Sequence, residues 1–258
     1  MKTEFASSKR AILLFTRSPE NEARSKPLSE HLSFDERVTL YESFTRHVLG
    51  QASRLAHSII IATDEPQYNF AQFSSQIAAI LPQRGVSFGE KFTAAISDAF
   101  SLGYEEVVCV GNDCLELTAS DLQTAFEKLF SHSLVLGDAK DGGVYLIGIQ
   151  RRGLTPILCA LKDCHWQTAI VLADLSRATR ALDISTCILR QRADIDTAFD
   201  LVAAGRRLFY LPFLKHFADK LSQAHIYFPF SQHSIFLSHH LDRLRYQKAP
   251  PTVLIHHA

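Results

Sequence analysis

The stretch VVCVGNDCLELTASDLQTAFEKLFSHSLVLGDAKDGGVYLIG, residues 107–148, combines strand and helix patterns and places a carboxylate at two of their junctions. The apolar run 107–110 predicts a buried strand, which leads directly into a small-residue turn holding Asp113. A helix follows, and later a second carboxylate, Asp141, precedes two glycines. Ligands of open α/β sheets bind in the crevice outside the carboxyl ends of the strands. This stretch is therefore a candidate site as well as part of a core.

Outward from this stretch, apolar runs and helical periodicity alternate along the chain. Strands are expected over residues 11–15, 58–62, 107–110, 133–137, 144–149 and 184–189. Helices are expected over residues 34–49, 88–102, 118–130, 154–161, 167–179 and 198–205. Residues 16–32 are expected to form a polar loop, and residues 65–79 fit no single pattern. The alternation predicts an α/β fold with a mostly parallel sheet covered by helices on both faces.

The pattern changes after residue 205. Aromatic residues are frequent over 208–230, and residues 231–247 read as another amphipathic helix. No Gly/Ser-rich linker separates the two parts, so residues 1–205 are expected to form the main domain. Residues 206–258 are then a C-terminal helical extension packed on it. A homodimer contact through the extension is the alternative, because exposed aromatic patches mark interfaces.

Composition bounds the class of protein. The chain has 258 residues, 47% of them hydrophobic and 21% charged, which is ordinary for a soluble globular protein. Its net charge of zero gives no electrostatic argument for nucleic acid. No apolar run approaches the roughly 20 residues that span a bilayer, and the N-terminus lacks the pattern of a secretory signal. A cytoplasmic location is expected. The five cysteines form no CxxC pair, which argues against a zinc site.

Acidic residues supply the first candidate ligands. Asp194 and Asp196 flank one residue of an extended segment, so both side chains can point the same way. Together with Asp113 they could hold one Mg²⁺ or Mn²⁺ on a nucleotide, since Mg²⁺ prefers few carboxylates plus phosphate oxygens. The alternative is that these residues only cap a turn and a helix. The turn at Asp141 has two interpretations as well: close approach of a ligand to its glycines, or an ordinary hairpin.

Cations gather in the loop after the first predicted strand. Arg17, Arg24 and Lys26 could neutralise phosphates there, and a solvated loop is the alternative. Neither GxxxxGK[ST] nor GxGxxG occurs, so the chain has no P-loop and no dinucleotide fingerprint. Trp166, the single tryptophan, either stacks on a sugar or base or anchors the core.

Taken in order, these residues resemble a known family. The matching pieces are Ile12-Leu13-Leu14-Phe15-x-Arg17-x-Pro19, Gly89-Glu90-Lys91-Phe92, Gly111-x-Asp113-Cys114-x-x-Leu117-Thr118, Gly137 through Gly148, Trp166-x-Thr168 and Asp194-x-Asp196-Thr197. The chain resembles the GT-A-like rSAM/selenodomain-associated transferases, within the nucleotide-diphospho-sugar transferase superfamily. The resemblance covers roughly residues 10–205.

What the resemblance implies is a GT-A (Rossmann-like) fold that binds a nucleotide-sugar or NTP and a small-molecule acceptor. It implies a metal-dependent, glycosyltransferase-like reaction using Mg²⁺ or Mn²⁺. The implied metal ligands are Asp113, Asp194 and Asp196. The implied catalytic residues are Asp141 and Lys26. The implied nucleotide- or substrate-binding residues are Phe15, Arg17, Arg24, Lys91, Gly111, Gly142, Gly143 and Trp166.

One loop departs from the family pattern. Where the family has Pro-x-x-Gly-x-x-Lys-Thr-Arg-Leu, this chain has Glu22 for the glycine, Ser25 for the lysine and Pro27 for the arginine. Lys26 and Arg24 could replace the missing cations after a small shift. Two alternatives stay open. One is a nucleotidyltransferase that joins an NTP to a phosphorylated small molecule, which the missing loop lysine and arginine disfavour; the other is a degenerate nucleotide-binding domain without turnover, which the altered loop favours.

Overall fold

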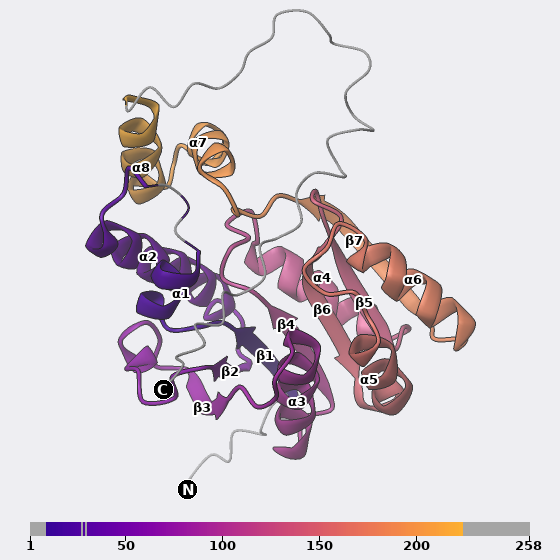
Figure 1. Cartoon of the computed structure of the whole chain (residues 1–258). Helices are drawn as coiled ribbons and strands as arrows, with labels where there is room; N and C mark the ends of the chain where they lie inside the picture. Colours follow the sequence, from indigo (N-terminus) through magenta and orange to yellow (C-terminus); the bar gives the residue numbers. More distant parts are fainter. Residues whose placement is uncertain (1–8, 27, 29, 224–258) are drawn as a thin grey trace, which may run out of the picture.

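The computed structural model describes residues 9–26, 28 and 30–223. Its strands are β1 (Arg10–Phe15), β2 (Ser58–Thr63), β3 (Ile77–Pro82), β4 (Glu106–Val110), β5 (Leu134–Ala139), β6 (Val144–Gln150) and β7 (Thr186–Arg192). They form one sheet in the order β3-β2-β1-β4-β6-β5-β7. Neighbouring strands are parallel except at β6, which runs antiparallel to both β4 and β5. The predicted mostly parallel α/β sheet is confirmed (Figure 1).

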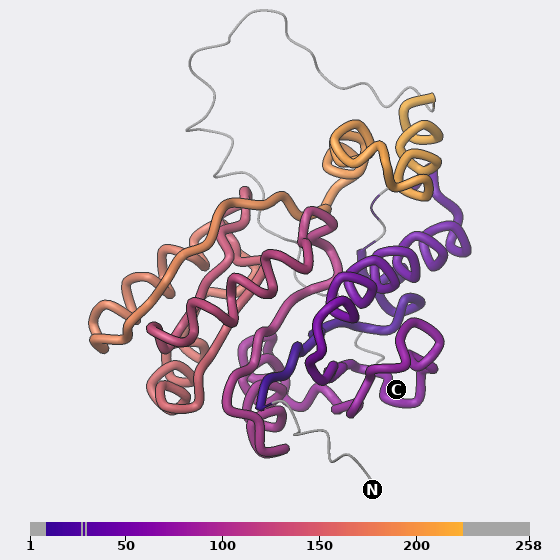
Figure 2. The backbone as a smooth tube through the Cα atoms, turned by 180° about the vertical axis from the view of Figure 1, so that it is seen from behind, coloured from indigo at the N-terminus to yellow at the C-terminus, as the bar shows by residue number. Residues whose placement is uncertain are grey.

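Helices cover both faces of this sheet. They are α1 (Pro19–Ser25), α2 (Phe34–Ala52), α3 (Phe88–Ser101), α4 (Ala119–Leu129), α5 (Leu154–Lys162), α6 (Val171–Ala181), α7 (Ala198–Arg207) and α8 (Pro212–Gln223), with the 3-10 turns η1 (Phe70–Gln72) and η2 (Arg151–Gly153). In Figure 1, α3, α5 and α6 lie on the near face, and the view from behind in Figure 2 brings α2 and α4 to the front. None of the helices in the described part of the chain is long and apolar enough to cross a membrane.

The two faces bury separate cores because successive strand side chains point to opposite sides. In β1, Ile12 and Leu14 pack with α2 and α4, whereas Leu13 packs with α3, α5 and α6. A third cluster joins α2 to α7 and α8, and it contains Phe44, Leu201 and Phe217. The part of the C-terminal segment that the structure describes thus packs on α2 and α7. The helix predicted over 231–247 lies outside the described residues.

Capping signals fix where several helices begin. Two capping boxes are formed by Ser33 with Glu36 and by Thr118 with Asp121. Thr197 caps α7 in the same way, with Asp200 as its partner. Side-chain oxygens at these positions satisfy backbone N–H groups that have no partner in a first helical turn.

Two sequence expectations were wrong in detail, and one ambiguity is settled. The expected polar loop 16–32 contains helix α1, because Ser18 accepts from Asn21 N and Pro19 suits the first helical position. Residues 65–79, which fit no single pattern, hold η1 and the start of the edge strand β3. Helix α6 begins at Val171 instead of residue 167.

Candidate functional site

The predicted site residues lie where the strands end. The carboxyl ends of β1, β4, β5 and β7 lie at the same end of the sheet. Because β6 is antiparallel to its neighbours, its amino end lies there too. Strand order reverses between β1 and β4, because β2 lies on one side of β1 and β4 on the other. Such a switch point opens the crevice in which open α/β sheets bind ligands.

Three carboxylates lie close together at this end of the sheet. Asp141, Asp194 and Asp196 each offer an oxygen, and these atoms all lie within 4.8 Å of one another. Asp141 is exposed and the other two are half-buried. Carboxylate oxygens are hard ligands that suit Mg²⁺, and one or two of them plus phosphate oxygens form its usual protein site. The donor set therefore fits a divalent cation. Asp113, the third predicted ligand, is not one of these three residues, and its role as a ligand stays a prediction.

Asp113 instead pairs with Lys26. The Lys26 Nζ lies 3.0 Å from Asp113 Oδ2 and 3.6 Å from Asp196 Oδ1. The lysine ends α1, where its backbone N–H donates to Glu22 O and its carbonyl accepts from the Tyr41 hydroxyl, at 2.7 Å in each case. The segment that follows α1 therefore brings the Lys26 ammonium to Asp113 and Asp196.

Electrostatics keep this lysine charged. Burial acts to lower the Lys26 pKa, but the charge of Asp113 and those of two further carboxylates act the other way. The net result is a Lys26 pKa well above its usual value, so the side chain is an ammonium at neutral pH. An ammonium in this place suits a phosphate oxygen and not the removal of a proton.

Glu22 is a buried acid beside this pair. It is 6% exposed, and its Oε2 has no hydrogen-bond partner. Burial raises the Glu22 pKa, against the lowering effect of the nearby Lys26 charge. The Arg17 charge and a hydrogen bond from the Arg17 backbone also act to lower it.

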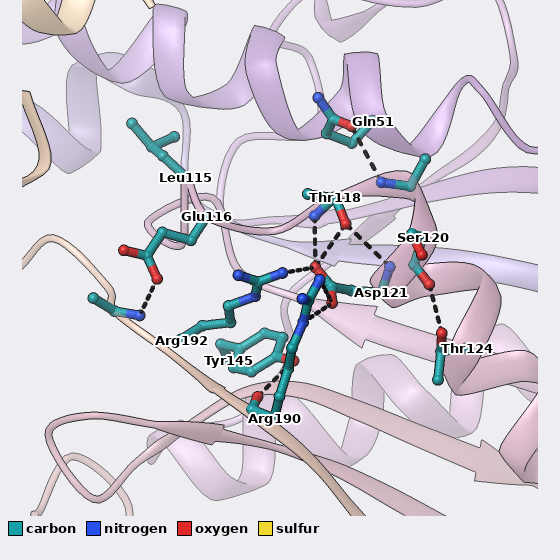
Figure 3. A network of polar contacts seen from close by, with 12 residues as sticks. Gln51, Leu115, Glu116, Thr118, Ser120, Asp121, Thr124, Tyr145, Arg190 and Arg192 are labelled. Atoms are coloured by element: carbon teal, nitrogen blue, oxygen red, sulfur yellow. Dashed lines mark hydrogen bonds and ion pairs between the residues drawn. The ribbon is translucent and has the colours of Figure 1, made fainter. Parts of the chain in front are cut away.

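The segment after β7 is held by a polar network. Arg192 donates to Asp121 Oδ2 at 2.8 Å, and Asp121 also caps α4 (Figure 3). Further along, Ala193 N donates to Glu116 Oε2 at 3.1 Å. Ile195 N donates to Asp113 O at 3.1 Å, and its side chain is buried. Because the Ile195 side chain faces the core, the side chains of its neighbours Asp194 and Asp196 point the other way, toward the carboxyl ends of the strands.

The glycine turn between β5 and β6 brings Asp141 to the other carboxylates. Gly142 N donates to Ala139 O at 3.0 Å, so the hairpin interpretation is confirmed. Asp141 Oδ1 accepts from Gly143 N at 2.8 Å. Gly142 has φ +87°, and a Cβ there would lie 2.0 Å from the Ala169 carbonyl oxygen. The turn is thus compatible with both interpretations: it closes a hairpin and presents a carboxylate.

Gly111 leaves room for the acid that follows it. A Cβ on Gly111 would lie 2.8 Å from Asp113 Oδ1. A side chain there would move the carboxylate that holds Lys26, which explains glycine at this position without a ligand. Close approach of a nucleotide to Gly111 stays a prediction.

The remaining predicted binding residues lie on different elements. Phe15 ends β1 and packs edge-on against Phe92 at a ring-centroid distance of 5.2 Å. Arg24 is turned toward its own neighbours, since its Nη1 donates to Asn21 Oδ1 at 2.9 Å and its guanidinium lies over Phe34. Lys91 lies in the first turn of α3. The structure therefore brings Lys26 to the carboxylates but not Arg24.

Trp166 is half-buried and packs against the core. Its ring lies 5.0 Å from that of Phe92 and 5.1 Å from that of Phe88, measured between centroids. Its Nε1 donates to Leu161 O at 2.7 Å, so the indole N–H is already used. These contacts favour the core-anchor interpretation over the stacking one.

Sequence reasoning missed residues that hold the site together. The buried Glu22 and the pairing of Asp121 with Arg192 were not predicted as parts of it. The sequence places Asp121 three residues after Thr118, a spacing typical of a capping box, but nothing in it shows that a distant arginine contacts Asp121. Ser18 followed by Pro19 is the signal that could have revealed α1 and its buried face.

Comparisons with known proteins agree with this fold. Residues 45–168 match the DUF2064 family model, described as "Uncharacterized protein conserved in bacteria". A nucleotide-diphospho-sugar transferase candidate from Desulfovibrio desulfuricans G20 superposes with a TM-score of 0.71 and 24% identity, over 84% of this chain and 98% of that one. No curated protein sequence matches the chain.

Two further structures share the fold at low identity. The 4-diphosphocytidyl-2C-methyl-D-erythritol synthase of Anaerococcus prevotii DSM 20548 has a TM-score of 0.54 and 10% identity, over 78% of this chain and 97% of its own. A CMP:2-keto-3-deoxy-manno-octonic acid synthetase complexed with CTP has a TM-score of 0.51 and 12% identity, over 79% of this chain and 99% of its own. These similarities show the GT-A-like fold. The narrower resemblance to rSAM/selenodomain-associated transferases stays a prediction.

Proposed function

We propose that this chain is a nucleotide-binding transferase that uses a divalent cation and a nucleotide-diphospho-sugar. One observation carries the proposal: Asp141, Asp194 and Asp196 offer converging oxygens beyond the carboxyl ends of β5 and β7, with the Lys26 ammonium beside Asp196. Carboxylates alone would repel a diphosphate. A site that combines them with an ammonium has the charges needed for a cation and a phosphate together.

In this proposal the cation, Mg²⁺ or Mn²⁺, would be held by the three aspartates and would offset negative charge as the nucleotide leaves. Lys26 binds a phosphate oxygen and keeps the diphosphate in place. An oxygen of Asp141 that is not engaged with the cation orients the acceptor hydroxyl and takes its proton. The acceptor oxygen forms a bond to the anomeric carbon, and the bond from that carbon to the diphosphate oxygen breaks.

A second candidate is a nucleotidyltransferase. Here an oxygen of a phosphorylated substrate attacks the α-phosphorus of an NTP, and pyrophosphate leaves. The presence of Lys26 at the acidic site favours it, because a triphosphate needs a fixed cation and the altered loop still supplies one. The fold is shared with a synthetase whose structure contains CTP and with an enzyme named as a 4-diphosphocytidyl-2C-methyl-D-erythritol synthase.

Thermal unfolding separates these functions. Nucleotides and nucleotide-sugars would be screened with and without Mn²⁺, and a ligand at about 100 times its Kd should add about 2.7 kcal/mol of stability. A cation-dependent shift with diphospho-sugars supports the first function, and a preference for an NTP supports the second. Asp196→Asn should abolish the shift, whereas Asp219→Asn on α8, a distant exposed carboxylate, should retain it.

Absence of a shift with every nucleotide would contradict both enzymatic functions. A cation-independent shift without turnover would instead support the degenerate nucleotide-binding domain. Product release measured on the ligand that shifts most then distinguishes an enzyme from a binding domain.

A further inference from the structure

The Asp196 carboxylate belongs to two groups of charges, the three aspartates and the ion pair with Lys26. This carboxylate is one of the three that could surround a divalent cation, and it is also the second acid that the Lys26 ammonium approaches, at 3.6 Å. A divalent cation at the aspartates and an ammonium at this distance carry like charges and draw on the same group. Repulsion between them is strong at short range in a partly buried site.

Lys26 has an alternative to Asp196. Its nearer partner is Asp113, at 3.0 Å, and that carboxylate does not belong to the group of three. The backbone of Lys26 is fixed, because its N–H and carbonyl are both hydrogen-bonded. The side chain is a flexible four-carbon stem that is 38% exposed. The ammonium can therefore move without any change in the fold.

The charges around Lys26 stabilise its ammonium both with and without a divalent cation at the aspartates. Glu22 is buried next to Lys26, and its Oε2 lacks a hydrogen-bond partner. Asp113 keeps negative charge near the ammonium after Asp196 is withdrawn. In the protein without a divalent cation, Lys26 therefore acts as the counter-ion of the acidic site.

We propose that Lys26 and the divalent cation compete for Asp196, so that cation binding releases the Lys26 ammonium to a phosphate of the ligand. This inference rests on the proposed cation site, and it adds an order of events. The cation binds before the phosphate or together with it, because without the cation the lysine is neutralised by its own acids. Lys26 is in this sense a positioning residue for the cation as well as a phosphate ligand.

Calorimetric titration with Mn²⁺ alone tests the competition. Lys26→Met should bind Mn²⁺ more tightly than the wild-type protein, by roughly fivefold or more, as expected for removal of one adjacent like charge. Lys26→Arg keeps the charge and should remain near the wild-type affinity. Lys140→Met is the matched control, because Lys140 is an exposed lysine next to Asp141 in the chain and its loss removes the same charge. It should change Mn²⁺ affinity much less.

Pyrophosphate supplies the second measurement. Wild-type protein should bind pyrophosphate with Mg²⁺ and not without it. Lys26→Met should bind pyrophosphate in neither condition. Thermal unfolding confirms that each variant is folded, and Lys26→Gln replaces Lys26→Met if that variant is not.

The outcomes separate the two ideas. Equal Mn²⁺ affinity in wild type and Lys26→Met, or an equal gain in Lys140→Met, overturns the competition and leaves the cation site standing. Pyrophosphate binding by wild-type protein without a divalent cation overturns the order of events. Failure of the wild-type protein to bind Mn²⁺ at all overturns the cation site itself, and the proposed function with it.

Discussion

Arg192 donates to Asp121 Oδ2 at 2.8 Å and thereby ties the end of β7 to the first turn of α4. Both partners are largely removed from solvent, with side chains 16% and 5% exposed. The carboxylates Asp194 and Asp196 follow Arg192 directly, so the ion pair fixes the point from which they extend. A structural contact outside the candidate site thus determines the geometry of the site.

Asp121→Asn should lower both stability and cation affinity. Removing one partner of a buried ion pair costs about 3–5 kcal/mol, because the remaining charge is left unpaired. Urea unfolding measures this loss, and Mn²⁺ titration should show weaker binding. The control is Arg190→Met, since Arg190 also contacts Asp121 but is 61% exposed. Its loss should cost less than about 1 kcal/mol because solvent screens the pair. Equal effects of the two variants would contradict a positioning role for Arg192.

The ion pair between Asp121 and Arg192 should make the stability of the protein depend on pH. Burial acts to raise the pKa of Asp121, but hydrogen bonds from Thr118 and the two arginines outweigh it and lower that pKa. A lowered folded-state pKa stabilises the protein above the unfolded value of about 3.9. This stability should disappear as the pH falls through the lower, folded-state pKa. The acid limb of the wild-type stability curve should therefore be steeper than that of Asp121→Asn.

Gly142→Ala should destabilise the turn between β5 and β6. The residue has φ +87°, and the new Cβ would lie 2.0 Å from the Ala169 carbonyl oxygen, a backbone atom that cannot rotate away. Strain of this kind costs about 1–3 kcal/mol, and the steric overlap adds to it. Gly50→Ala is the matched control: Gly50 is exposed in α2, with nothing within 4 Å of the new Cβ. That change should instead stabilise the protein by about 0.8 kcal/mol. Opposite signs in thermal unfolding are the expected result.

The sequence predicted the elements that have strong local signals. Apolar runs such as that of β4 and capping residues such as Ser33 depend on neighbours in the chain, so their structures follow from the sequence alone. The glycine turn at Asp141 was also visible. By contrast, β3 has half-buried residues without a clear period, since it lies at the edge of the sheet.

The composition of the site depended on distances that the sequence does not contain. The strand ends predicted that Asp113 and the late acidic pair would lie at one edge. Whether Asp113 or Asp141 would join Asp194 and Asp196 depended on the path of α1, which brings Lys26 to Asp113. Because α1 was taken for a loop, the lysine could be assigned only by analogy.

Trp166→Phe tests whether the tryptophan supports the fold or stacks on a ligand. The change removes the hydrogen bond to Leu161 O and part of the contact with Phe88 and Phe92. A loss of about 1–3 kcal/mol is expected, typical of a partly conservative change in a packed core. The cation-dependent thermal shift caused by a nucleotide should remain. Loss of that shift at unchanged stability would instead show a stacking role.

Glu22→Gln should stabilise the protein at neutral pH. Burial raises the Glu22 pKa above its unfolded value, so the folded protein holds this proton more tightly than the unfolded chain does. Stability is then lost as the pH rises from the unfolded pKa through the folded one, because ionising the buried acid is unfavourable. The amide cannot ionise and avoids this loss, so the variant should be the more stable protein above the unfolded pKa. Thermal unfolding of both proteins between pH 4 and pH 8 should show curves that coincide in acid and separate above it, with the variant higher. A variant that is less stable at pH 8 would mean that the attraction between Glu22 and Lys26 exceeds the cost of burying the carboxylate.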